Sequence, residues 1–109
     1  MKASWRVFTN AHDKESARVL LKRTIKALGV EASEAETEPY YKGGFLISFG
    51  TVPASSVWSE KVVELIALAE KVGRGWILSG SIIEALDLWS NESTIAGVQS
   101  IHLNCERNK

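Results

Sequence analysis

The acidic residues of this sequence are concentrated in two stretches that contain no lysine or arginine, residues 27–41 and residues 75–106, and aromatic residues accompany both. Carboxylates attract cationic groups, and neighbouring tyrosine or tryptophan rings supply contact area at a small cost in conformational entropy. Together these residue types suit recognition of a basic protein. The candidate partner-binding residues are Glu31, Glu34, Glu36, Glu38, Tyr40 and Tyr41 in the first stretch, and Glu84, Asp87, Trp89 and Glu92 in the second.

The first acidic stretch also has a purely structural interpretation. Charged side chains on an edge strand deter pairing with the sheet of another molecule, and the glutamates before Tyr40 fit that role as well. Both interpretations stay open from the sequence. If the two stretches adjoin in the fold, they form one acidic aromatic patch, with Trp89 or the tyrosines as its central anchor.

The basic residues are concentrated at the other end of the chain, within residues 1–26. Lys14, Arg18, Lys22 and Lys26 recur four residues apart, so they form one ridge along a helix. Such a ridge suits phosphate groups or an acidic protein, but it equally suits the solvated outer face of an amphipathic helix. The formal net charge is zero at pH 7 and no aromatic residues interleave with the ridge, which argues against nucleic-acid binding.

Residues capable of catalysis or metal binding do not form a recognisable motif. His12 and Asp13 are adjacent, but neighbouring side chains at a helix start point apart, and Asp13 fits the helix N-cap. His102 and Cys105 are three residues apart on an expected strand, so they face opposite sides and cannot share a metal ion. No glycine-rich phosphate loop is present. We therefore expect no catalytic residues, no metal site and no cofactor, and a function other than that of an enzyme.

Hydrophobic periodicity predicts the elements that position these residues. Period-two alternation marks strands, and apolar residues at three- and four-residue spacing mark helices. Pro39 restricts its own strand to the edge of a sheet, because proline cannot donate to a central ladder. The expected order begins with a strand at 5–9, a helix from about Asp13 to Gly29, an edge strand at about 34–41 and a turn at Gly43–Gly44. A central strand at 45–52 follows, and then a second helix, which has a serine cap within 53–56, runs to Val72 and is stopped by Gly73–Gly75. The last expected strands are at 76–81 and 98–105.

Residues 82–89 fit two patterns. Ser81 and Glu84 match a helix capping box, whereas Leu86 and Leu88 alternate with Asp87 and Trp89 as in a strand. We favour the strand, followed by a polar loop at 90–94.

This order of elements predicts an α+β protein. Two main helices on one face of a mostly antiparallel sheet make a two-layer sandwich. The plan is similar to the ferredoxin-like βαββαβ arrangement with one or more extra C-terminal strands. That fold hosts many unrelated functions, so it does not by itself indicate one.

The composition is that of an ordinary folded domain. The chain has 109 residues, of which 45% are hydrophobic and 24% charged, and this predicts a single domain spanning 1–109 with one core. No apolar run approaches the ~20 residues that span a bilayer, and the lone Cys105 suits a reducing compartment. We expect a cytoplasmic protein without a membrane partner.

Two segments of the C-terminal third carry a resemblance to a known family. They are the expected strand within Gly75–Gly80 and the segment Ile95–Val98 that leads into the last strand. In these segments, in size and in layout, the chain resembles bacterial toxin-immunity proteins of the contact-dependent growth inhibition type. The resemblance implies an inhibitor that neutralises a cognate toxin, such as a nuclease, by covering its basic active cleft with the acidic aromatic patch. The alternative is a ferredoxin-like regulatory or small-ligand-binding domain that acts as a homodimer.

Overall fold

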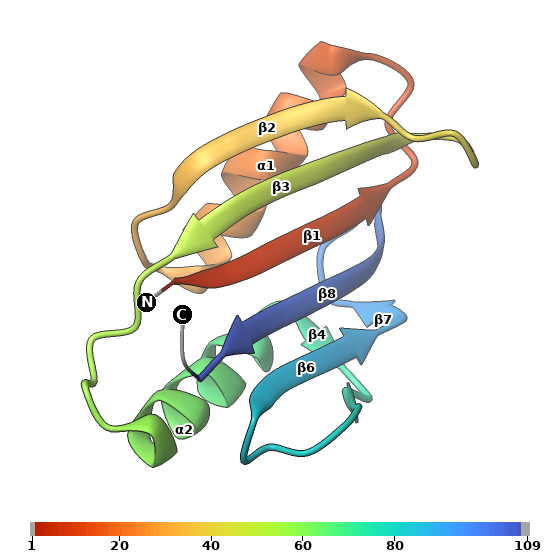
Figure 1. Cartoon of the computed structure of the whole chain (residues 1–109). Helices are drawn as coiled ribbons and strands as arrows, with labels where there is room; N and C mark the ends of the chain where they lie inside the picture. Colours follow the sequence, from red (N-terminus) through yellow and green to blue (C-terminus); the bar gives the residue numbers. More distant parts are fainter. Residues whose placement is uncertain (1, 108–109) are drawn as a thin grey trace.

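The computed structural model describes residues 2–107 and shows an α+β protein with two helices and a mostly antiparallel sheet (Figure 1). The two helices within the described residues are α1 (Lys14–Leu28) and α2 (Trp58–Ala69). A small second sheet in the same part of the chain consists of two short strands, β4 (Gly73–Arg74) and β7 (Glu92–Ser93). The main sheet in this part of the chain has six strands, which in spatial order are β2 (Ser33–Pro39), β3 (Phe45–Thr51), β1 (Ala3–Thr9), β8 (Val98–Glu106), β6 (Ala85–Ser90) and β5 (Ile77–Leu78).

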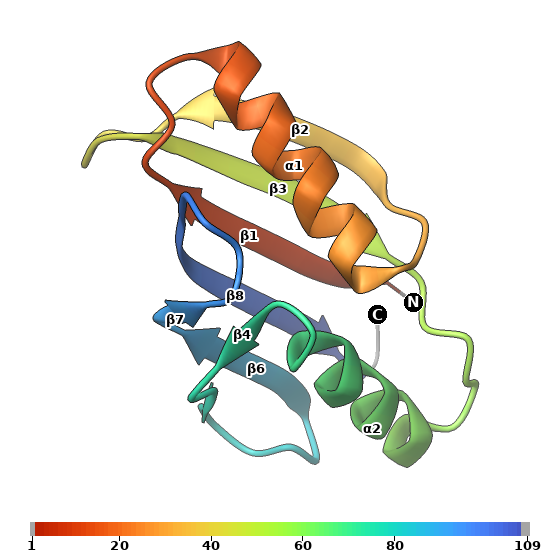
Figure 2. The same cartoon turned by 180° about the vertical axis from the view of Figure 1, so that it is seen from behind.

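Both helices lie on the same face of the main sheet (Figure 2). α1 lies over β2, β3 and β1, while α2 lies on the half of the sheet that contains β8 and β6. The hydrophobic core fills the space between the two layers, because the strands alternate and their apolar side chains point toward the helices. Its largest fully buried side chains include Trp5, Ile47, Leu65, Leu86, Ile101 and Leu103.

The N-terminal strand and helix follow the predicted pattern closely. Every second residue of β1 from Ala3 to Thr9 is buried, as period-two alternation requires. α1 begins after Asp13, whose carboxylate accepts a 2.8 Å hydrogen bond from the Ser16 N–H. This bond lowers the pKa of the Asp13 carboxyl. The helix ends at Gly29, which adopts φ 72° and donates its N–H to the Ile25 carbonyl, so the cap predicted there is confirmed.

The predicted edge strand, turn and central strand are also confirmed, with one change at the turn. β2 ends at Pro39, so Tyr40 and Tyr41 belong to the turn rather than to the strand. The Gly43 N–H donates to the Tyr40 carbonyl at 2.9 Å, which closes the turn. Gly44 has φ 74°, and a Cβ atom there would collide with the carbonyl oxygen of Thr9 in β1. Only glycine therefore lets the hairpin approach β1 this closely.

The predicted serine cap of α2 is wrong. The helix begins at Trp58 after Val57, which makes no side-chain capping bond. Ser55 instead contacts Glu64 of α2, donating to its carboxylate through both its N–H and its hydroxyl at 3.1 Å. The Ala54 N–H adds a 2.8 Å bond to the same carboxylate. The loop before α2 is thus held against the second turn of the helix, and these bonds outweigh partial burial to lower the pKa of Glu64.

The segment after α2 differs most from the sequence-based expectation. α2 ends at Ala69, earlier than Val72, and Gly73–Arg74 form strand β4 rather than a simple stop. The long strand predicted at 76–81 is wrong, because only Ile77 and Leu78 pair with β6. Gly75 and Gly80 adopt φ 59° and 72°, which breaks extended backbone on both sides of that pair.

Residues 85–90 form strand β6, so the strand favoured for 82–89 is confirmed from residue 85 onward. Residues 82–84 form a turn instead. The predicted loop at 90–94 is wrong in part, since it contains β7, which pairs with β4. The ferredoxin-like βαββαβ layout is not confirmed, because the described part of the chain has six strands in the main sheet and two in a second sheet. The additional strands β4 to β7 lie between α2 and β8 in the sequence. The strand that pairs with β1 is therefore β8, and not the segment that directly follows α2.

Candidate functional site: the open face of the sheet

The side of the main sheet opposite the helices, here called the open face, carries side chains from all six of its strands. Directly paired residues of antiparallel strands point to the same side, so the register defines rows across the sheet. One row from β2 to β5 consists of Glu36, Ser48, Arg6, His102, Trp89 and Ile77. The rows on either side contain Glu38, Leu46, Phe8 and Ser100, and Gly50, Ser4, Asn104 and Asp87.

Five rings form a chain across the open face, from the β2–β3 turn to β6 and β8, and we call them the aromatic cluster: Phe8, Tyr40, Tyr41, Trp89 and His102. The Phe8 and Trp89 rings stack with centroids 5.6 Å apart, and Tyr40 meets the Phe8 ring edge-on at 5.2 Å. Tyr41 contacts Tyr40 at 4.9 Å, and the imidazole of His102 lies flat against Trp89 at 4.4 Å. The cluster is a continuous aromatic surface, the kind that dominates interface energetics.

A shallow hollow of about 260 Å³ lies within this surface, between Phe8, Tyr40 and Trp89. Ser100 of β8 lies beside it, and its small side chain leaves room for Phe8 and Trp89 to meet across the strand that separates them. Lys42 and Gly43 of the hairpin also line the hollow. Small-molecule sites usually enclose about 300–1,000 Å³, so this hollow suits one anchoring side chain of a partner better than a cofactor.

A polar network borders the aromatic cluster on the β6 side. Nε2 of His102 is 2.6 Å from Oδ1 of Asp87, and the Asn104 amide donates to the same oxygen at 3.0 Å. Arg6 lies 3.3 Å from Nδ1 of His102. Because arginine can only donate, Nδ1 accepts from Arg6, and the proton of a neutral imidazole is on Nε2, which donates to Asp87. Both ring nitrogens are therefore engaged, and His102 is held against Trp89.

The environment of Asp87 lowers the pKa of its carboxyl below the ordinary value of 3.8. Burial acts to raise it, but the hydrogen bonds from Asn104 and His102 and the nearby charges of His102 and Arg6 outweigh that effect. A carboxyl with a lowered pKa stabilises the folded state above its unfolded pKa, and this stabilisation is lost as the pH falls through the folded pKa.

Asp87→Asn is therefore expected to reduce the free energy of unfolding by about 1 kcal/mol at neutral pH, because a charged hydrogen-bond acceptor is lost. The difference from the wild type should shrink as the pH falls below 3.8, when the wild-type carboxyl also becomes protonated. Urea unfolding at a series of pH values measures this difference. A gap between the two proteins that stays constant down to about pH 2 would contradict the assigned network.

The structure brings together part of the predicted site. Tyr40, Tyr41 and Trp89 join the aromatic cluster through Phe8, and Asp87 joins it through His102. Glu36 and Glu38 lie on the open face at the β2 edge. β2 and β6 are separated by β3, β1 and β8, so the acidic residues at the two ends are about 19 Å apart and do not form one acidic patch.

Other predicted residues lie away from the open face. Glu31 is exposed in the loop after α1, and Glu84 is exposed in the turn before β6. Glu92 lies in β7, and its carboxylate is next to Gly75 on the helix side of the sheet. Glu34, in contrast, lies at an irregularity of β2, forms an ion pair with Lys2 and lines a hollow of the open face with Ser4 and Arg6.

The acidic β2 edge adjoins the basic ridge of α1. Lys14 and Arg18 share a groove of about 340 Å³ with Glu36 and Glu38, so positive and negative side chains border each other at this edge. The ridge residues are exposed along the outer side of α1, as a solvated helix face requires. The separation of charge along the sequence therefore becomes a close mixture of charges in the fold.

Sequence reasoning missed Phe8, Arg6 and His102 as site residues. Phe8 and Arg6 lie on the side of β1 opposite Trp5, which the alternation pattern marks as the solvent side. An apolar ring on that side was the signal that could have marked Phe8 as a site residue. Which strands flank β1 was not readable from sequence, so nothing linked Phe8 to Trp89. His102 and Cys105 do lie on opposite faces of β8, as predicted, and burial raises the pKa of the Cys105 thiol.

Within residues 2–107, no three histidine, cysteine, aspartate or glutamate side chains gather closely enough to hold a metal ion. None of the helices described is both long and apolar enough to cross a membrane. The arrangement of the open face, with rings at its centre and charges around them, is that of a binding surface.

Comparison with known proteins finds no matching family model, no matching curated protein and no matching solved structure.

Proposed function

We propose that this protein binds another protein through the open face of its sheet. The observation that carries the proposal is the aromatic cluster, a chain of five rings, each in contact with the next, on the face that neither helix covers. Contiguous aromatic surface with a nearby arginine is typical of interface centres. Tyr41 is 83% exposed, so most of its side chain is accessible to another protein.

The partner is expected to be basic where it meets the β2 edge. Glu36 and Glu38 are exposed there, and Glu38 lies in the same row of the open face as Phe8, whereas the carboxylates of Glu34 and Asp87 are already paired with Lys2 and His102. Inhibition of a cognate toxin is the specific form of this function that we propose, as in the immunity proteins that the sequence resembles. The aromatic cluster would anchor the centre of the interface and the two glutamates would face cations of the toxin.

Charge reversal at the β2 edge tests this orientation. The partner is first obtained by co-purification with the intact protein from its native host and is then prepared in pure form. Glu36→Lys with Glu38→Lys should slow association about ten-fold at low salt, with a smaller effect at high salt, because exposed charges steer encounter. Glu31→Lys is the matched control, since Glu31 is also exposed but lies off the open face. An association rate unchanged by the double reversal would contradict the proposal.

A ferredoxin-like homodimer that binds a small ligand is the other function expected from the sequence, and two copies would then pair through the open face. Light scattering distinguishes the two functions. A stable dimer that Tyr41→Ala converts to monomer, without any bound partner protein, would favour the homodimer.

A further inference from the structure

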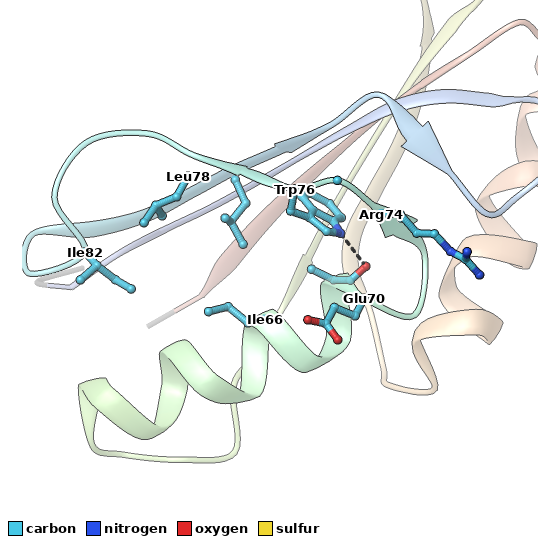
Figure 3. Close-up of a pocket in the computed structure, with 10 residues that line it drawn as sticks. Ile66, Glu70, Arg74, Trp76, Leu78 and Ile82 are labelled. Carbon is cyan, nitrogen blue, oxygen red and sulfur yellow. Dashed lines mark hydrogen bonds between the residues drawn. The ribbon is translucent and has the colours of Figure 1, made fainter.

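A second cavity, of about 550 Å³, lies on the helix side of the sheet between α2 and the segment 75–82 (Figure 3). Its walls come from Ile66 and Ala69 of α2, Leu78 and Ile82 of the segment and Leu88 of β6. The volume falls within the range of small-molecule sites, about 300–1,000 Å³. The sheet separates this cavity from the open face, so it is independent of the proposed protein interface.

Two tryptophans hold the segment in place over the cavity. Nε1 of Trp76 donates to the Ala69 carbonyl at 3.1 Å, at the C-terminal end of α2. Nε1 of Trp58, in the first turn of α2, donates to the Ile82 carbonyl at 2.8 Å. The segment is thus tied to both ends of the helix and spans the space between them. The cavity is therefore preformed, as ligand sites usually are.

The cavity walls are apolar side chains that the fold leaves partly in water. Leu78 is 48% and Ile82 is 37% exposed, and the sequence from Gly75 to Ile83 contains no charged residue. Protein interiors normally close such spaces, because unfilled apolar cavities forfeit packing interactions. An apolar group seated between Leu78, Ile82 and Ile66 would remove this surface from water.

Two charged residues border this apolar space, Glu70 and Arg74. Glu70 follows Ile66 by one helical turn, and Figure 3 shows the two side chains next to each other at the α2 wall. Among residues 2–107, neither an ion pair nor a hydrogen bond of the Glu70 carboxylate is seen. Arg74 also borders the cavity, but its side chain extends away from Leu78 and Ile82, and in the β4–β7 register it lies opposite Glu92.

We propose that this cavity binds a small organic cation with an apolar body, such as an arylalkyl amine. The apolar body lies against Leu78, Ile82 and Ile66, and the ammonium group lies between the Glu70 carboxylate and the indole of Trp76. Attraction of a cation to both a carboxylate and an aromatic ring selects amines over neutral molecules of the same shape.

The test compares three probes of nearly equal size: naphthylmethylamine, naphthylmethanol and naphthoate. Titration of the intact protein, followed by NMR of the Trp76 indole N–H and the Gly73 and Gly75 amides, gives a dissociation constant for each. The amine is expected to bind about five-fold more tightly than the alcohol, and the naphthoate most weakly. Glu70→Gln should reduce the preference for the amine to the part that the Trp76 indole supplies, while the alcohol binds as before. Glu60→Gln, at an exposed position of the same helix, should leave the preference intact.

Equal affinity for the amine and the alcohol in the wild type would overturn the proposal, as would a preference for the amine that is undiminished in Glu70→Gln. Shifts confined to the Trp89 indole would also overturn it, because they would place the probe on the open face. None of these outcomes depends on the protein partner, so the proposal fails or holds separately from the proposed function.

Discussion

Trp89→Ala is expected to weaken binding of the protein partner about 100-fold. Trp89 lies at the centre of the aromatic cluster, stacked on both Phe8 and His102, and it lines the hollow on the open face. Central aromatic residues that fill such positions contribute about 2 kcal/mol or more when truncated. Titration calorimetry with the purified partner measures the loss, and thermal unfolding of the free variant checks that it is folded.

Two further variants make this prediction specific. Trp89→Phe keeps a ring against Phe8 and His102, so it should lose less affinity than the alanine variant. Trp58→Ala removes a partly buried tryptophan of the same size from the helix side and should leave partner binding unchanged. Equal losses in Trp58→Ala and Trp89→Ala would show that general destabilisation, and not the open face, explains the effect.

Trp5→Ala is expected to reduce the free energy of unfolding by about 3–5 kcal/mol, a large share of the roughly 5–15 kcal/mol of a typical domain. The Trp5 side chain is 0% exposed, its ring stacks on Phe49 with centroids 6.0 Å apart, and its indole N–H donates to the Thr51 hydroxyl at 3.0 Å. Alanine would leave a cavity between β1 and the helices and an unpaired hydroxyl.

Urea unfolding measures the loss, and two substitutions serve as comparisons. Trp5→Phe keeps most of the packing and should cost less than the alanine variant, about 1–2 kcal/mol. Val19→Ala, at an exposed position of α1, should change stability by less than about 0.5 kcal/mol. A loss below about 1 kcal/mol in Trp5→Ala would mean that this end of the core is not closely packed.

The elements predicted best are those with long periodic patterns and side-chain or glycine caps. α1 has Asp13 at its start and Gly29 at its end, and both act within a few residues of the helix. β3 and β8 are long enough for alternation to be unambiguous. In each case the decisive interaction is local, so the residues beside it in the sequence are sufficient to predict it.

Predictions failed where an element depends on distant residues. Ser55 looked like a helix cap, but Glu64 of the following helix binds it instead. Strands β4, β5 and β7 have two residues each, which is too short for periodicity to be visible. They form because β4 pairs with β7 and β5 pairs with β6, and neither partner adjoins its strand in the sequence.

The candidate site shows the same division. Tyr40, Tyr41 and Trp89 were identified from their residue types and their acidic neighbours. Phe8 was not, because its role depends on β8 lying between β1 and β6 with the small Ser100 at the crossing point. The cavity beside Glu70 was not identified either, since it depends on a segment that two tryptophans hold over α2.

The sequence by itself determined the fold class, the position of the main helices and central strands, and the residue types available for binding, because each follows from periodicity and local capping. The tertiary structure alone decided which of these residues meet. Strand order separates the glutamates of β2 from Asp87 of β6 by about 19 Å and places the β2 glutamates beside the basic ridge of α1, so the charge separation seen along the chain is not kept in space. The physical reason is that the order of strands in a sheet depends on packing and pairing over the whole sheet, and not on neighbouring residues in the sequence. The same strand order brings Tyr40, Phe8, Trp89 and His102 together into one aromatic surface.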